Sequence, residues 1–192
     1  MINYYETAIL ENEHLYGPGK RLIIWVQGCS LRCDGCVNEH LWSFDIRKNI
    51  AVGALMEMLD DSIEGITLHG GEPLDQSEEL FELCKRAKKY NKTIILFTGY
   101  KKVELEAVKL KLWNLADIVV CGRFEKEKVR YNLQFKGSTN QRVITHKGQY
   151  KKYRCHNGKQ VALLDVEKNG AISVKGFLTE DIKKIYNGLV VM

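Results

Sequence analysis

Apolar runs of strand length alternate with amphipathic stretches of helix length along this chain up to about residue 146. Strands that are apolar almost throughout are typical of a parallel sheet whose faces are covered by helices. The sequence therefore predicts an α/β protein. The expected strands are residues 21–27, 65–71, 93–99, 117–122 and 142–146, and the expected helices lie around residues 52–59, 80–87 and 105–115.

A parallel sheet also predicts where a functional site forms, because the carboxyl ends of its strands share one rim. Cysteine-rich residues 28–36 follow the first expected strand, and the HGGEP segment (69–73) ends the second. TGY (98–100) and CGRF (121–124) end the third and fourth. We expect these four segments, which are far apart in sequence, to meet at one pocket mouth.

Length and cysteine usage indicate one cytoplasmic domain. A chain of 192 residues can bury a full-sized core but is too short for two ordinary domains and a linker. Its amino terminus lacks a basic start followed by an apolar stretch, which predicts no signal peptide, and the apolar run at 22–26 is too short to cross a membrane. Six cysteines without an export signal indicate a reducing compartment, where thiols stay free to bind metal.

The formal charge of +5 comes largely from two basic runs, residues 85–92 and 147–154. The first run ends an expected helix, where lysines suit the negative end of the helix dipole. No nucleic-acid recognition motif accompanies either run. The sequence therefore predicts neither a nucleic-acid partner nor a membrane partner.

From Lys147 onward the strand-and-helix pattern changes. Asn157-Gly158 and Asn169-Gly170 favour two-residue turns between short strands. A last helix is expected from a Thr179 cap to a Gly188 stop. We therefore divide the chain into a core of residues 1–146 and an extension of residues 147–192 that packs on it.

Cys29, Cys33 and Cys36 form a C-x3-C-x2-C motif after the first expected strand. Three clustered thiolates select a soft centre, either zinc or an iron–sulfur cluster. His40 could complete a closed Cys3His zinc site. Alternatively, a four-iron cubane held by these cysteines would keep one iron without a protein ligand, free to bind a small molecule. The spacing alone leaves both centres open.

The cysteine motif, together with Gly70-Gly71-Glu72-Pro73 after the second strand, resembles the radical S-adenosylmethionine superfamily. Residues 17–29, 33–38 and 122–144 are similar to one branch of it, the anaerobic ribonucleotide reductase activating proteins, which are close to the pyruvate formate-lyase activating enzymes. The resemblance runs from about Tyr16 to Ile144. It implies an incomplete (β/α)6 radical-SAM barrel carrying a small C-terminal extension of a β-hairpin and a helix.

The resemblance also implies a cofactor set. Cys29, Cys33 and Cys36 would bind three irons of a [4Fe-4S] cluster, and S-adenosyl-L-methionine would chelate the fourth. One electron from the cluster would then break the cofactor's carbon–sulfur bond and form a 5′-deoxyadenosyl radical. The residues expected to contact the cofactor are Gly35, Gly70, Gly71, Glu72 and Thr98.

The activity implied is that of an oxygen-sensitive oxidoreductase that installs a glycyl radical on a partner, an anaerobic ribonucleotide reductase. A flavodoxin- or ferredoxin-type protein would donate the electron. Two alternatives stay open. The same chemistry could act directly on a small molecule or peptide, or the cysteines could belong to a zinc or electron-transfer module without catalysis.

The remaining cysteines are expected to be dispensable for the cluster. Cys84 lies on the apolar face of an expected helix, where cysteine acts as a small core residue. Cys121 lies near the end of an expected apolar strand, and Cys155 stands beside His156 without further ligand types nearby. None of the three belongs to a second ligand cluster in the sequence.

Overall fold

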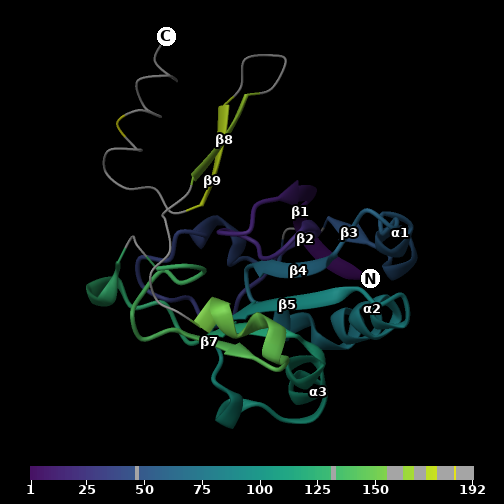
Figure 1. Cartoon of the computed structure of the whole chain (residues 1–192). Helices are drawn as coiled ribbons and strands as arrows, with labels where there is room; N and C mark the ends of the chain where they lie inside the picture. Colours follow the sequence, from purple (N-terminus) through teal and green to yellow (C-terminus); the bar gives the residue numbers. More distant parts are fainter. Residues whose placement is uncertain (46–47, 131–132, 155–161, 167–171, 177–183, 185–192) are drawn as a thin grey trace.

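The computed structural model describes residues 1–45, 48–130, 133–154, 162–166, 172–176 and 184. Its main feature is a seven-stranded sheet in the order β3-β1-β2-β4-β5-β6-β7 (Figure 1). The strands are β1 (Ile2–Glu11), β2 (Lys20–Val26), β3 (Asn49–Ile50), β4 (Gly65–Gly70), β5 (Thr93–Thr98), β6 (Ile118–Cys121) and β7 (Arg142–Thr145). Across the described part of the chain, no helix combines the length and the apolar character that crossing a membrane requires.

The central strands β2, β4, β5 and β6 pair in parallel, which confirms the α/β class. The parallel part has these four strands, fewer than the six βα units of the expected barrel. β7 pairs with β6 antiparallel. A parallel return needs a long crossover, usually a helix. The described residues between β6 and β7 form no α-helix. They contain the short 3-10 turn η4 (Lys126–Lys128) and an isolated antiparallel bridge between Val129 and Ser138, so the chain returns in the opposite direction.

β1 and β3 lie outside the predicted strands. β1 pairs antiparallel with β2 along most of its length and with β3 at its start. Its side chains mix polar and apolar types and are mostly half-buried or exposed. Such a strand carries little apolar signal of its own, and pairing with its neighbours decides its conformation.

Helices α1 (Val52–Glu57), α2 (Ser77–Lys89) and α3 (Ala107–Leu115) cover one face of the sheet (Figure 1). They pack on every second strand residue, including Ile24, Leu68 and Leu96. Cys84 of α2 is fully buried there, which confirms its expected role as a small core residue. Basic residues fill the last turn of α2, as the dipole argument predicts.

The opposite, inner face carries the alternate strand residues, and a buried arginine closes its base. Arg21 is the second residue of β2 and is fully shielded from solvent. Its guanidinium donates to the Thr67 and Thr93 hydroxyls at 2.7 and 2.8 Å and to the carbonyls of Pro18, Ile66 and Thr93. Burial lowers the pKa of Arg21 to about 10, so this side chain stays charged at neutral pH. We call this cluster of Arg21, Thr67 and Thr93 the floor.

The chain after β7 only partly follows the prediction. The 3-10 helix η5 (Gly148–Arg154) stands where short strands were expected, and it packs Tyr150 and Tyr153 beside Phe135. Three residues per turn place these two tyrosines on one side of η5. β8 (Ala162–Val166) and β9 (Ile172–Gly176) pair as the predicted hairpin.

Several expectations for this region fall outside the described residues. They are the two predicted turns, Cys155 and the helix from Thr179 to Gly188, of which the structure describes only residue 184. The division of the chain at residues 146 and 147 stays a prediction.

Candidate active site

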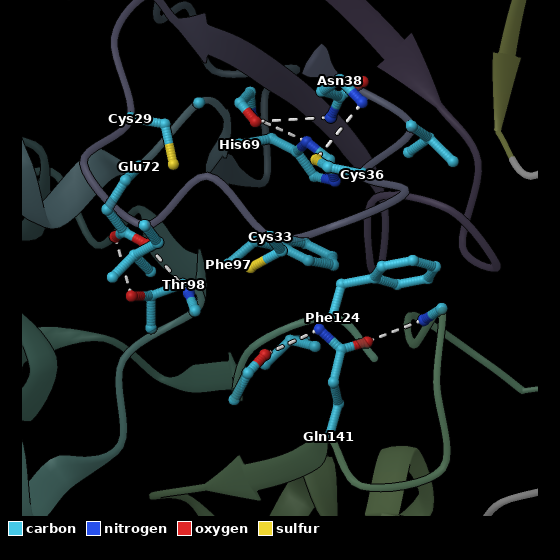
Figure 2. A pocket seen from close by; sticks show the side chains of 18 of the residues that line it. Cys29, Cys33, Cys36, Asn38, His69, Glu72, Phe97, Thr98, Phe124 and Gln141 are labelled. Carbon is cyan, nitrogen blue, oxygen red and sulfur yellow. Dashed lines mark hydrogen bonds between the residues drawn. The ribbon is translucent and has the colours of Figure 1, made fainter. Parts of the chain in front are cut away.

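A pocket of about 130 Å³ opens at the carboxyl-end rim of the parallel strands (Figure 2). The four segments that follow β2, β4, β5 and β6 all contribute to its lining, as the sequence predicts. Their lining residues include Cys29, Cys33, Cys36, His69, Gly70, Gly71, Glu72, Phe97, Thr98, Gly99, Val120, Gly122 and Phe124.

All three motif cysteines line this pocket as free thiols. Burial raises the pKa of Cys29 and Cys36 above the ordinary value for a thiol. These two thiols therefore hold their protons at neutral pH unless a metal displaces them. Figure 2 shows the sulfurs spread around the pocket instead of meeting at one point.

The donor set fits a cluster better than a single ion. Across the described part of the chain, no three Cys, His, Asp or Glu side chains are arranged to hold one metal ion. His40, the alternative zinc ligand, does not line the pocket, and its ring packs edge-on against Tyr5 at 5.3 Å between centroids. A cubane is larger than one ion and takes its thiolates from several directions. Three thiols around one cavity suit that requirement.

Backbone hydrogen bonds fix the start of the cysteine loop. The Gly28 N–H donates to the Leu41 carbonyl at 2.8 Å, and the Cys29 N–H donates to the Trp42 carbonyl at 3.1 Å. Leu41 ends the 3-10 helix η1 (Glu39–Leu41), which follows the third cysteine. From the turn after the neighbouring strand β4, the Glu72 N–H donates to the Gly28 carbonyl at 2.9 Å. The loop is therefore tied to the protein on both sides without a metal.

Gly70 and Gly71 line the pocket. Contacts within the protein require glycine at both positions, independently of any cofactor. Gly70 has a φ of +103°. A Cβ on Gly71 would lie 2.2 Å from the Gly28 carbonyl oxygen. The two glycines let β4 pack directly against the cysteine loop. Gly35 lies outside the lining, beside the Lys126 side chain, and its predicted contact with a cofactor stays a prediction.

Glu72 places a buried carboxylate at the pocket, with only 1% of its surface exposed. It accepts hydrogen bonds from the Leu74 N–H at 2.9 Å, the Thr98 hydroxyl at 2.7 Å and the Gly99 N–H at 2.8 Å. Burial nevertheless raises the pKa of Glu72 to about 7. A bound cation would favour the ionised carboxylate, so the site is suited to an ammonium group.

Thr98 serves the protein's own structure in two ways. Its hydroxyl donates to Glu72 and accepts the Tyr100 N–H at 3.1 Å, which caps the turn after β5. The hydroxyl proton is therefore committed to Glu72. Thr98 also lines the pocket, and its predicted contact with a cofactor stays a prediction.

His69 is a pocket residue to which the sequence argument gave no role. Its ring lies 4.5 Å from that of Phe97, centroid to centroid, and its Nδ1 accepts the Gly70 N–H at 2.7 Å. Desolvation lowers the pKa of His69 to about 4, so the imidazole is neutral. The period-two alternation along β4, which turns Thr67 and His69 to the same face, could have identified it.

Three further side chains that hold the site were also missed. Asp75 accepts the Ser30 N–H at 2.7 Å and the Tyr100 hydroxyl at 3.1 Å, joining three loops. Gln141 accepts the Gly137 N–H at 2.8 Å and donates to the Gly122 carbonyl at 2.9 Å (Figure 2). Trp42 lines the pocket, and its carbonyl accepts the Cys29 N–H. All three act through the folded structure. Gln141 belongs to the segment 122–144 that carries the family resemblance, but that resemblance gave it no role.

Comparison with known proteins gives a consistent result. Residues 15–144 match the family model described as a 4Fe-4S single cluster domain. The anaerobic ribonucleoside-triphosphate reductase-activating protein of Haemophilus influenzae is 31% identical over 150 residues, covering 73% of this chain and 94% of that protein. The protein of the same name from Escherichia coli K12 is 31% identical over 153 residues, covering 74% and 96%. A crystal structure of QueE from Escherichia coli aligns with a TM-score of 0.40 and 18% identity over 51% of this chain and 52% of that one.

Proposed function

The chain belongs to the radical S-adenosylmethionine family, among the relatives of the anaerobic ribonucleoside-triphosphate reductase-activating proteins, and we propose that it installs a glycyl radical on a partner reductase of that kind. The observation that carries this proposal is the pocket in which three free thiols and a buried carboxylate face one cavity. The similarity to the activating proteins of Haemophilus influenzae and Escherichia coli over most of their length supports the choice of partner.

Cys29, Cys33 and Cys36 would hold the [4Fe-4S] cluster, and S-adenosylmethionine would bind beside it in the same pocket. When bound, the two cofactors supply a strongly reducing electron and the radical chemistry that removes a hydrogen atom from carbon. The raised thiol pKa values mean that loading the cluster releases protons from the cysteines.

Glu72 would accept a hydrogen bond from the ammonium group of S-adenosylmethionine. The Leu74 N–H, the Thr98 hydroxyl and the Gly99 N–H fix the direction of its carboxylate. Because the pKa of Glu72 is about 7, the carboxyl group loses its proton when the ammonium binds near neutral pH. Glu72 would thus contribute a charge-assisted hydrogen bond to binding of the cofactor.

The apolar part of the lining would keep water from the reacting atoms. Phe97, Val120, Phe124 and Phe135 all line the pocket. Val37 also lines it, and 57% of this side chain is exposed. The lining therefore continues to the protein surface, where a glycine-bearing loop of a partner could enter.

The electron donor would be a separate protein of the flavodoxin or ferredoxin type, acting in the cytoplasm. Within the described residues, the two cysteines outside the motif, Cys84 and Cys121, are both buried in the helix-covered core. Neither lies at the surface, where a second cluster could receive electrons. An external one-electron donor is thus the simplest supply.

The test uses the whole chain, reconstituted anaerobically with iron and sulfide and reduced with dithionite. It should bind about four irons, absorb in the visible and release 5′-deoxyadenosine from S-adenosylmethionine. Mixed with an anaerobic ribonucleotide reductase from the same organism, it should produce the EPR doublet of a glycyl radical. Replacing the partner's radical-bearing glycine by alanine should remove that doublet.

Two results would contradict the proposal at different points. A colourless protein that keeps one tightly bound zinc would exclude the cluster. A cluster-loaded protein that converts a metabolite or peptide but leaves every candidate reductase without a radical would exclude the partner and retain the cofactor chemistry.

A further inference from the structure

The turn after β5 lies directly against the cysteine loop. A Cβ on Gly99 would lie only 2.4 Å from the Leu31 side chain, so the two segments are in close contact. The Tyr100 hydroxyl lies 3.1 Å from the Ser30 hydroxyl. Ser30 is joined by a peptide bond to Cys29, the first cysteine of the motif. This turn therefore borders the loop on its Cys29 side.

Four cationic side chains lie on this turn or against it. The Lys109 Nζ lies 4.5 Å from the centre of the Tyr100 ring, and the Arg123 guanidinium carbon lies 5.7 Å from it. Both distances are within the range of cation–π contacts. Lys101 and Lys102 follow Tyr100 in the chain and are exposed. We call Lys101, Lys102, Lys109 and Arg123 the basic face.

The protein compensates only half of this positive charge. Arg123 pairs with Glu104 at 2.7 Å, and the Lys109 Nζ lies 3.6 Å from the Asp75 carboxylate. Within the described part of the chain, the two lysines of the turn itself have no carboxylate at ion-pair distance. The basic face therefore keeps two positive charges that are free to attract another molecule.

Val103 places an apolar side chain among these charges. It belongs to the 3-10 turn η3 (Lys102–Glu104) and is 92% exposed. A single exposed valine is not unusual on its own. Here it stands beside two uncompensated lysines, and interfaces between proteins commonly surround apolar contacts with polar groups. The turn thus offers a partner both electrostatic attraction and an apolar contact.

We propose that the basic face, together with Val103, is the docking surface for the electron donor, an acidic one-electron carrier protein. This inference rests on the proposed function, which places a cluster at the cysteine loop and requires an external donor. It assigns the donor a surface separate from the exposed Val37 side of the pocket, where the glycine-bearing loop of the reductase would enter.

Charge and position together select this occupant. Uncompensated lysines attract an acidic protein and speed its encounter with the chain. Electron-transfer complexes are small and short-lived, so such steering matters more to them than a large buried area. A carrier on the basic face would be close to Tyr100, whose hydroxyl contacts Ser30 beside Cys29. The flavin of a flavodoxin would lose one electron, passing from anionic hydroquinone to neutral semiquinone, and the cluster would gain it without movement of a proton.

The first test measures binding to the cluster-loaded chain under anaerobic conditions. The probes are an acidic flavodoxin and an acidic ferredoxin from the same organism, and the comparison is between the wild type and Lys101→Glu/Lys102→Glu. We expect the dissociation constant of the tighter-binding probe to rise about tenfold, because each reversal turns attraction into repulsion. Raising the salt concentration should weaken binding to the wild type and reduce the difference, because salt screens exposed charges.

Two further variants make the comparison specific. Lys85→Glu/Lys89→Glu is the matched control, since it changes the net charge equally at two exposed positions of α2. α2 begins after the GGEP segment at the rim, so its last turns lie at the far end of the sheet, and the probe should bind this variant nearly as tightly as the wild type. Lys101→Gln/Lys102→Gln removes the positive charges without placing new carboxylates beside Glu104. It should give an intermediate loss of affinity even if the reversed charges disturb the turn.

The second test separates docking from chemistry. Reduction of the cluster by the reduced probe, followed by loss of visible absorbance, should slow about tenfold in Lys101→Glu/Lys102→Glu at low salt. Reduction by dithionite, a small ion that needs no protein docking surface, should be nearly unchanged. With dithionite as reductant, this variant should also produce the glycyl radical on the reductase as the wild type does.

The outcomes distinguish this inference from the proposed function. Equal affinities in the wild type and Lys101→Glu/Lys102→Glu, an equal loss in the α2 control, or no binding of either probe to the wild type would each overturn the docking surface. Loss of the dithionite-driven glycyl radical in the variant would assign the basic face to the reductase and overturn it too. A wild-type chain that holds no cluster, or releases no 5′-deoxyadenosine with dithionite, would instead contradict the proposed function itself.

Discussion

The inner face of the sheet buries polar side chains at both ends of its parallel strands. The two ends differ in how completely the protein itself supplies hydrogen-bond partners for these side chains. At the floor, the Arg21 guanidinium meets five acceptor contacts from within the protein. At the mouth, Glu72 is equally buried and has three donors, yet burial still raises its pKa to about 7. At the mouth, the Trp42 indole N–H also has no hydrogen-bond partner among the described residues, and the cysteine thiols are free.

This difference distinguishes polar groups that are buried to stabilise the fold from polar groups that are buried to bind a ligand. A charge whose hydrogen bonds are all satisfied internally stabilises one conformation and requires no ligand. A buried acid with a raised pKa, next to free thiols and an unmatched donor, is complete only when something binds. The polar groups of the floor should therefore affect stability, and those of the mouth should affect cofactor binding and activity.

The largest effect is expected at the mouth. Cys29→Ala, Cys33→Ala and Cys36→Ala should each abolish cleavage of S-adenosylmethionine, because each would remove one cluster ligand. Iron analysis and the yield of 5′-deoxyadenosine measure the loss. Cys84→Ala should cost about 1 kcal/mol of unfolding free energy, as loss of a small buried group does, and should keep the cluster. Loss of iron in Cys121→Ser would instead show that the ligand set is wrong.

At the floor, Arg21→Met should act on stability alone. Removing the guanidinium leaves the buried hydroxyls of Thr67 and Thr93 and three carbonyls without their donor, which should cost roughly 3 kcal/mol of unfolding free energy. Urea unfolding of the metal-free protein measures it, with the exposed Lys85→Met of α2 as a control that should change little. An Arg21→Met variant that is as stable as the wild type but fails to bind cofactor would contradict the assignment of the floor to stability and the mouth to binding.

Glu72→Gln should weaken binding of S-adenosylmethionine by about 30-fold, corresponding to roughly 2 kcal/mol for a lost charge-assisted hydrogen bond. Isothermal titration of the cluster-loaded protein measures the affinity. The exposed Glu82→Gln should bind normally. An unchanged affinity in Glu72→Gln would mean that the ammonium lies elsewhere.

The raised pKa of Glu72 also predicts how stability and binding depend on pH. Its folded pKa of about 7 exceeds the ordinary value of 4.5, so its contribution to stability is fully present below pH 4.5 and is lost as the pH rises through about 7. Cofactor binding should show the opposite trend, strengthening as the pH rises through 7. Glu72→Gln should flatten both profiles, and profiles that stay steep would assign the titration to another group.

The smallest effect is expected in the hydrogen bonds that support the mouth. Tyr100→Phe removes a hydroxyl that lies 3.1 Å from both the Asp75 carboxylate and the Ser30 hydroxyl. Asp75 would keep its bond from the Ser30 N–H. We expect a loss of about 1 kcal/mol of unfolding free energy and less than about a threefold change in cofactor affinity. A larger loss of affinity would indicate that Tyr100 contributes more directly to the site.

The sequence predicted the features that depend on local pattern. Apolar runs identified the five strands from β2 to β7 other than β3, and their order predicted that the cysteine loop and the GGEP segment would meet. Features that depend on tertiary contacts were missed. β1 has no strong apolar pattern, β7 was expected to be parallel, and Arg21 looks like an ordinary strand-edge residue until its five contacts are seen.

The same distinction between local pattern and tertiary contact applies to the candidate site. The cysteine motif and Glu72 belong to contiguous motifs, so they were found. Trp42, His69 and Asp75 take their roles from neighbours on other strands and loops, which no spacing rule encodes. Thr98 was identified, but its bond to Glu72 could not be read from the sequence.

The anchored cysteine loop has a consequence for the lifetime of the protein. Its hydrogen bonds to Leu41, Trp42 and Glu72 are made by the chain itself, so little ordering entropy remains to be lost when iron binds. A zinc finger, by contrast, folds only with its metal. Loss of an oxidised cluster should therefore leave a folded receptor that can be refilled, and repair after exposure to air would require iron and sulfide instead of a newly synthesised chain.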